Sequence, residues 1–273
     1  MRALLCSIAA FLVVLLAAAP RALAQTSNES TLTIAPDGVV SIHVVDCNVH
    51  VVGSTRRDVK VTAPSNEVRV TGDGSHVSIT VRPGGAPSMD VAVPSGVHLE
   101  VHGVEAGITI HDVAGPVQAG TVDGNISVDG AGHDVEASSV SGSVDVSIKH
   151  GDVRASSVSG TVSIHLATGG AAWAKTVSGP VTVGGAPLTR AEARTHSGTV
   201  DIDARLEGDG PFEAHTHSGN VHVVLPKAAP VTVDARTHHG RVDNPDAGTP
   251  APGPAHTVLT VWTFSGDVHV ERK

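Results

Sequence analysis

The chain has 273 residues, of which 40% are hydrophobic, and this is enough for one sizeable core. Its formal net charge is −9 with neutral histidines, and no basic stripe offsets this balance, which argues against nucleic acid as a partner. Aromatic residues make up only 2% of the chain and tyrosine is absent, so bulky rings do not fill the interior.

The first 24 residues have the pattern of a secretory signal peptide. A basic start at Arg2 precedes an apolar run over residues 3–19, and Ala22-Leu23-Ala24 forms a small-residue cleavage site. We therefore expect residues 1–24 to be removed and an exported mature chain to begin at Gln25. That chain keeps 16 basic and 27 acidic residues, a net charge of about −11, and has no other stretch apolar enough to cross a membrane. An uncleaved membrane anchor is the alternative interpretation.

Residues 25–102 alternate apolar and polar positions in short runs separated by turn formers, which is typical of strands with one buried face. The runs cover residues 40–44, 49–51, 59–61, 68–70, 77–81 and 91–93. No window of this region has a helical period, so the predicted fold is all-β. Cys47 is the only cysteine of the mature chain, which excludes an internal disulfide, and we interpret it as a small buried hydrophobe and not as a reactive thiol.

Residues 103–273 repeat one phrase, in which Thr or Ser, one further residue and Ser-Gly precede an alternating Val-x-Val. Successive glycines lie 18, 18, 19, 19, 21, 21 and 26 residues apart, which predicts one stacked rung per copy and hence a parallel β-solenoid. We expect the strands of residues 25–102 to begin the stack. The eight predicted structural corners are Gly124, Gly142, Gly160, Gly179, Gly198, Gly219, Gly240 and Gly266.

Alignment of the copies on these glycines gives columns of identical residues. Valine or isoleucine stands two residues after each glycine, and alanine stands five before it in seven copies, as in Ala119 and Ala137. Such columns predict core ladders one strand spacing apart in a thin, flattened coil. The second turn of each rung varies in length, and its longest version, the Pro/Gly-rich segment 243–256, is predicted to be a disordered loop.

The corner residues have a structural explanation that needs no ligand. Glycine permits positive φ at a sharp bend, and the serine before it can bind the backbone of the turn. The Ser/Thr column three residues before the glycine predicts a ladder of hydroxyl groups in which each rung donates to the next.

The repeated corner, the Asp90-Val-Ala-Val-Pro94 run with Leu99-Glu-Val101, and Leu225-Pro226 followed by Thr237-His-His-Gly240 resemble the bacterial envelope family known as "putative adhesin". This resemblance implies a β-solenoid and an exported location in the periplasm, on the cell surface or in the medium. The family is a domain of unknown function and brings no catalytic residues. The chain departs from its pattern after the glycine, where only Asp267 matches the usual aspartate, and in its many histidines.

The histidines are the strongest candidates for chemistry. The column two residues before the glycine holds four copies of valine, then His196, His217 and His238, with His215 close by. If the rungs stack in register, three imidazoles lie one above another and could bind zinc, copper or nickel weakly. The alternative is that histidine replaces valine as a flat side chain that stacks well. No cofactor is otherwise expected.

An enzyme acting on polysaccharide is a third class to consider, since it would need clustered carboxylates beside aromatic platforms. Asp145, Asp201 and Asp243 share a column, but Ser163, Thr182 and His222 separate them. We therefore expect a non-catalytic adhesin or envelope scaffold whose partner is a cell-envelope glycan or protein. An exposed terminal rung could also pair edge to edge with a second chain, against which the polar residues 28–30 and 271–273 offer mild protection.

Overall fold

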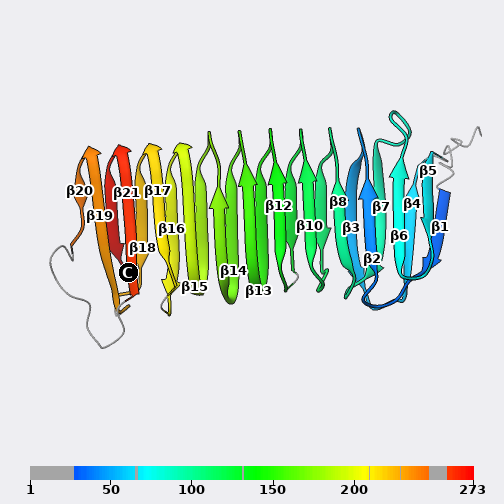
Figure 1. Cartoon of the computed structure of the whole chain (residues 1–273), viewed down its shortest axis with the longest axis horizontal. Coiled ribbons are helices and arrows are strands. Elements are labelled where there is room, and N and C mark those ends of the chain that lie inside the picture. The colour runs from blue at the N-terminus through cyan, green and yellow to red at the C-terminus, as the bar shows by residue number, and fades with distance from the viewer. Residues whose placement is uncertain (1–27, 65–66, 131, 209, 228, 246–256) are drawn as a thin grey trace, which may run out of the picture.

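The computed structural model describes residues 28–64, 67–130, 132–208, 210–227, 229–245 and 257–273. Within these ranges the chain forms strands joined by turns, and it has no helix that could cross a membrane. The expected signal peptide, residues 1–24, lies outside the described residues, as does most of the expected loop 243–256. The predicted all-β solenoid is confirmed, and Figure 1 shows its strands as one long row.

The strands stack in two parallel series, which we call sheet I and sheet II. Each rung has one strand from sheet I, a corner and one strand from sheet II, and in most of the regular rungs the corner is Ser-Gly. Sheet I contains β2 (Val39–His43), β6 (His76–Val81), β8 (His98–His102), β10 (Val117–Thr121), β12 (Val135–Ser139), β17 (Phe212–Ser218), β19 (Val231–His239) and β21 (Thr257–Ser265). Sheet II contains β3 (Asn48–Ser54), β7 (Ser88–Pro94), β9 (Ile108–His111), β11 (Ile126–Asp129), β16 (Val200–Leu206), β18 (Val221–Leu225), β20 (Val242–Asp243) and β22 (Val268–Arg272).

Three long strands connect the two sheets in the middle of the stack. These are β13 (Val144–Ser157), β14 (Val162–Lys175) and β15 (Val181–Ser197). The first half of each lies in sheet II, and the second half lies in sheet I of the next rung, with a register shift between the halves. The shift lies in the second turn, where rung length varies.

The core consists of the predicted ladders. In β10 and β12, Val117 pairs with Val135 and Ala119 with Ala137, and all four side chains are buried. The valine and isoleucine positions after the corner glycine are likewise in register along sheet II. Val242 is the exception, since it lies in the outermost rung and is 38% exposed. Each ladder gains its burial from the rungs on both sides, so the end rung buries least.

Antiparallel strands cover the N-terminal end of the stack. In sheet II, β4 (Asp58–Ala63) pairs with β7, and β1 (Asn28–Thr33) pairs with β4. In sheet I, β5 (Val68–Gly72) pairs with β6. The parallel stack ends where these strands run antiparallel to it. The exposed ion pair between Lys60 Nζ and Glu29 Oε1, 3.0 Å apart, places charged side chains near this edge, which disfavours pairing with another strand.

The order of rungs in space differs from their order in the sequence at both ends. The rung β2/β3 lies between β6/β7 and β8/β9. At the other end, β21/β22 lies between β17/β18 and β19/β20, so the last rung of the chain is inserted before the preceding one. Rungs that are neighbours in space are therefore not always consecutive in the sequence. Figure 1 shows the C-terminus inside the row, with β19 and β20 beyond it.

This inserted rung also changes which strands form the exposed edge. Strand β22 is not the outermost strand of sheet II, because it pairs with β18 on one side and, through Val268 and His269, with β20 on the other. Among the described strands, β19 is the outermost strand of sheet I at this end of the stack and pairs only with β21. Edge-to-edge association with a second chain stays a prediction. At the C-terminal end of the stack it applies to β19, and at the N-terminal end residues 28–30 lie in the edge strand β1.

Candidate functional site

The Ser-Gly corners are structural, and their hydrogen bonds differ from the predicted ladder. In seven of the eight copies the Ser or Thr hydroxyl donates to the carbonyl oxygen of the corner glycine in the neighbouring rung and not to another hydroxyl. Thr121 donates to the carbonyl oxygen of Ala106, which takes the place of that glycine. Ser157 Oγ lies 2.8 Å from Gly142 O, and Thr263 Oγ1 lies 3.1 Å from Gly219 O. The second example joins the inserted rung to its neighbour, so the bond does not require the two rungs to be consecutive in the sequence.

Glycine is required at the corners because the rungs approach each other closely there. A Cβ atom on Gly160 would lie 2.1 Å from Gly142 O, and one on Gly198 would lie 1.9 Å from Gly179 O. Positive φ, which we expected to be the reason, occurs at only four of the eight corners. Those four are Gly124, Gly179, Gly219 and Gly266, with φ between 147° and 159°.

The residues two positions before the corner glycines point outward and form one continuous row along the corner edge. Val104, which stands two positions before Ala106, extends this row by one rung, since Asp123 N donates to Val104 O. Five consecutive valines of this row are 44% to 48% exposed. Backbone hydrogen bonds between neighbouring corners, such as Ser141 N to Val122 O, hold the row in register. In spatial order this corner row consists of Val104, Val122, Val140, Val158, Val177, His196, His217, Phe264 and His238.

The predicted run of three adjacent imidazoles is wrong. The rings of His196 and His217 stack with centroids 4.8 Å apart and planes 2° apart, but Phe264 from the inserted rung then separates His217 from His238. His215 lies on the face of sheet I, next to Trp262 and 3.7 Å from Glu213, and not in the corner row. As they stand, the rings of His196 and His217 hold their nitrogen lone pairs in parallel planes that do not point at one common atom. Metal binding by these four histidines stays a prediction.

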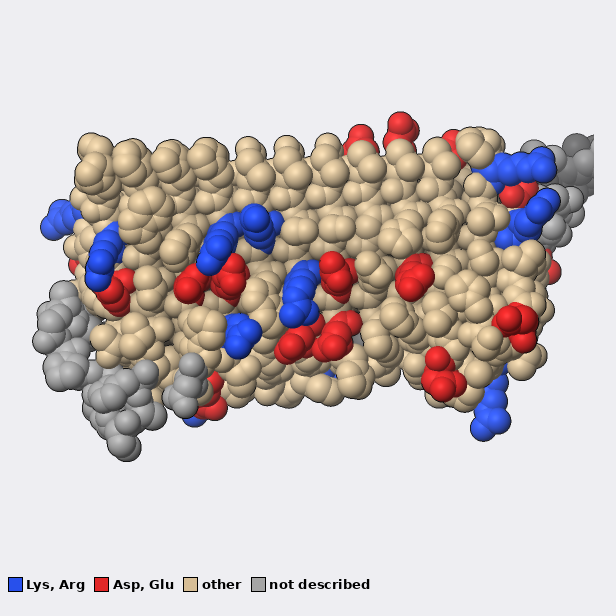
Figure 2. Space-filling view, viewed as in Figure 1, with Lys and Arg blue, Asp and Glu red and all other residues tan. Residues whose placement is uncertain are grey.

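Sheet I presents a broad face with mixed charges, which Figure 2 shows as a central band of interspersed basic and acidic side chains. Arg194 forms ion pairs with Glu192 at 2.9 Å and with Glu213 at 2.7 Å. Exposed pairs of this kind contribute about 0–1 kcal/mol each to stability. Because neighbouring charges neutralise one another, the band gives no long-range attraction for one sign of ligand.

The half-buried ring of Trp173 on this face is partly covered by arginine side chains. The guanidinium carbon of Arg154 lies 4.3 Å from the ring centre of Trp173, and that of Arg190 lies 5.5 Å from it. A hollow of about 310 Å³ beside the ring is lined by charged side chains, including Glu136 and Lys175. A sugar stacking on Trp173 would have to displace an arginine, so this ring is a poor platform.

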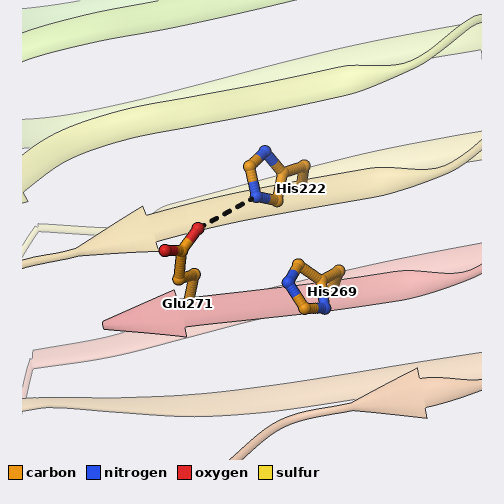
Figure 3. A group of neighbouring side chains, drawn as sticks. All are labelled: His222, His269 and Glu271. Carbon is orange, nitrogen blue, oxygen red and sulfur yellow. Dashed lines mark ion pairs between the residues drawn. The ribbon is translucent and has the colours of Figure 1, made fainter. Parts of the chain in front are cut away.

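On sheet II the inserted rung brings together two histidines and a glutamate that sequence analysis did not connect. His222 of β18 is in register with His269 of β22, and Glu271 lies two residues after His269. One ligand atom from each of the three lies within 4.8 Å of the other two, and this is the only such group among the described residues. Figure 3 shows both imidazoles beside the carboxylate, on neighbouring strands.

Two aspartates flank these histidines along the same column of sheet II. Asp243 Oδ2 lies 3.1 Å from His269 Nδ1, at hydrogen-bond distance, and Asp201 Oδ1 lies 3.7 Å from His222 Nδ1. The remaining nitrogen of His222, Nε2, lies 3.9 Å from Glu271 Oε2. The arrangement therefore directs Nδ1 of each ring toward an aspartate and leaves Nε2 for the centre of the group.

The aspartates that stand three residues after a corner glycine lie in sheet II as the repeat predicts. Asp145 and Asp201 are separated by Ser163 and Thr182, so no two carboxylates of this column are neighbours there.

Cys47 is fully buried, and burial, followed by the charge of Asp46, raises the pKa of its thiol to about 11. A thiol with so high a pKa is a poor nucleophile, in agreement with its interpretation as a core residue.

Comparison with solved structures finds proteins named as adhesins or cell adhesion proteins, at low sequence identity and low TM-score. A "putative adhesin" from Bacteroides fragilis NCTC 9343 has 11% identity and a TM-score of 0.37, with 89% of this chain and 96% of that one covered. A "putative adhesin" from Parabacteroides merdae ATCC 43184 has 12% identity and a TM-score of 0.27, with 88% and 95% covered. A "putative cell adhesion protein" from Clostridium sporogenes ATCC 15579 has 10% identity and a TM-score of 0.22, with 90% and 100% covered.

The comparison with protein families is more informative. No curated protein matches the chain. The family model described as Toastrack DUF4097 matches residues 39–271, from the first residue of β2 into β22, and so includes the inserted rungs at both ends of the stack. The chain belongs to the Toastrack DUF4097 family, to which the "putative adhesin" resemblance of the sequence had pointed.

Proposed function

We propose that the chain is an exported, non-catalytic protein of the cell envelope that binds a glycan or a protein partner along an extended surface. The corner row is the observation that carries this proposal. Five consecutive rungs, from Val104 to Val177, expose the same β-branched apolar side chain along one edge. Repetition at about 4.8 Å offers a partner the same contact many times over, which suits binding along a length and not in one pocket.

The size of each contact explains why the row must act as a whole. Full burial of a valine side chain contributes about 1.5–3 kcal/mol, so a valine that is already half-buried adds about 1 kcal/mol when a partner covers it. Association costs at least about 4 kcal/mol in lost freedom of motion. One valine therefore cannot hold a partner, whereas five in a row approach or exceed this cost.

The export part of the proposal rests on the leader pattern of residues 1–24 and on the family resemblance. The proposal of export covers the periplasm, the cell surface and the medium alike. The non-catalytic part is supported by the separated aspartates of sheet II and by the arginines that cover Trp173.

A pull-down from envelope material tests the proposal. The mature chain, freed of any tag, is immobilised and exposed to envelope glycans and proteins, beside a variant in which Val122, Val140 and Val158 are all replaced by threonine. Threonine keeps the branched shape and replaces one of the two exposed methyl groups by a hydroxyl. The matched control replaces Gln118 and Ser138, which point outward from sheet I in the same rungs, by alanine.

We expect the wild-type chain and the control to retain one saturable partner and the threonine variant to lose it. Release by glycosidase or by protease then identifies the partner as glycan or protein. Equal retention by all three chains contradicts the corner row as the contact surface. No retention by any of them contradicts the binding function itself.

A further inference from the structure

His222 and His269 share a site only because the last rung is inserted into the stack. In sequence order β18 would be followed by β20, and Asp243 would lie beside His222. The observed pairing of β18 with β22 places His269 there instead and moves Asp243 to the far side of His269. The resulting column reads Asp201, His222, His269, Asp243, with Glu271 beside the two histidines.

The flanking aspartates prepare both rings to act as ligands. A metal-bound histidine usually gives its second ring N–H to a carboxylate, which fixes the tautomer and the direction of the free nitrogen. His269 Nδ1 has this partner in Asp243 at 3.1 Å, and His222 Nδ1 faces Asp201 at 3.7 Å. With a proton on Nδ1, the lone pair is on Nε2, the nitrogen that in His222 faces Glu271 at 3.9 Å.

We propose that His222, His269 and Glu271 bind one divalent transition-metal ion, with zinc as the best fit. Two imidazoles and one carboxylate suit zinc, copper or nickel, whereas magnesium and calcium prefer oxygen ligands alone. The three side chains supply three ligands, and water completes the shell on the solvent side. The site lies on sheet II and is independent of the corner row, so it can be present or absent whatever partner that row binds.

The geometry requires a small closure that exposed side chains can make. Tetrahedral zinc with bonds of about 2.0–2.1 Å holds its ligand atoms about 3.4 Å apart. The three ligand atoms here lie within 4.8 Å of one another, on side chains that are 41%, 52% and 42% exposed for His222, His269 and Glu271. The rings are also 16° from parallel at a centroid distance of 5.4 Å, so rotation about the side-chain bonds is needed to converge them. The strands beneath need not move.

Bound metal would join β18 to β22, two strands that are far apart in the sequence. The ion would therefore cross-link the inserted rung to its neighbour and act as a local clasp, because the metal would lose two of its ligands, His269 and Glu271, if β22 separated from β18. A site that binds metal in the folded chain and not in the unfolded chain stabilises the fold in proportion to its occupancy.

Calorimetric titration of zinc into the tag-free mature chain tests the site. We expect one equivalent to bind, His269→Ala to weaken the affinity at least tenfold, and Asp243→Ala to weaken it about tenfold through the loss of ring orientation. His165→Ala is the matched control, because His165 is an exposed histidine on the same sheet that belongs to no cluster. Unchanged binding by His269→Ala, or no binding by the wild-type chain, overturns the proposal.

A second titration separates this site from the corner row. His217→Ala should bind zinc as the wild type does, and loss of binding in that variant would assign the metal to the stacked histidines instead. Hydrogen exchange gives a readout that does not depend on affinity. Zinc should slow exchange in β18 and β22 and leave β11 unchanged, whereas equal slowing in all three strands would contradict a local clasp.

Discussion

Replacement of a corner glycine tests the close approach of the rungs directly. In Gly160→Ala the new Cβ would lie 2.1 Å from Gly142 O, against the 3.4 Å or more of an ordinary contact. The two rungs would have to separate locally by about 1 Å, and overpacking of this kind costs about 1–3 kcal/mol. The hydrogen bond from Ser157 Oγ to Gly142 O, 2.8 Å long, crosses the same gap and adds about 1 kcal/mol when it breaks. We therefore expect a loss of about 2–4 kcal/mol.

Urea unfolding followed by circular dichroism measures this loss, with two variants for comparison. Ser157→Ala removes the hydrogen bond alone and should cost about 1 kcal/mol. Gly120→Ala is the matched glycine control, because its Cβ would meet nothing closer than 3.5 Å in strand β10 and the alanine restricts the unfolded chain. It should be neutral or slightly stabilising. A Gly160→Ala variant as stable as Gly120→Ala would refute the steric argument for the corners.

Three further predictions concern other parts of the chain. The Cys47 thiol, whose pKa burial raises to about 11, should resist alkylation at pH 8 in the folded chain and react on unfolding, and rapid labelling of the folded chain would contradict its burial. The pKa of Asp73 is lowered to about 2 by hydrogen bonds from the hydroxyl and the backbone of the turn that follows it. Its contribution to stability is therefore present above the unfolded value of about 3.9 and is lost as the pH falls toward 2, so the gap in melting temperature between wild type and Asp73→Ala should close over that range. The inserted rung can be checked by cysteine pairs: Glu213→Cys with Thr260→Cys should form a disulfide, because these residues are partners on neighbouring strands, whereas Glu213→Cys with Asp234→Cys should not, since two strand spacings exceed the limit of about 7 Å. A disulfide in the second pair would mean that β17 and β19 are neighbours, and it would contradict the insertion of β21 between them.

The sequence by itself determined the fold class, the core and the corners. Alternating Val-x-Val runs can bury only one face, and their recurrence with a Ser-Gly turn leaves a stacked coil as the way to cover that face. The buried columns of Ala119 and Val144 follow from this pattern, as does the thin cross-section. These features depend on local backbone geometry and on the period of the repeat, and both can be predicted from the amino-acid sequence.

The tertiary structure alone decided which rungs are neighbours. Every rung offers the same hydrogen-bonding edge and nearly the same apolar columns, so sequence order and permuted order satisfy the hydrophobic pattern equally well. The repeat therefore predicted the column of His196, His217 and His238 but not the insertion of Phe264. The same degeneracy hid the pairing of His222 with His269, which no spacing in the sequence reveals. In a solenoid the side chains along a column are fixed by the repeat, but their neighbours are fixed by the order in which the rungs assemble.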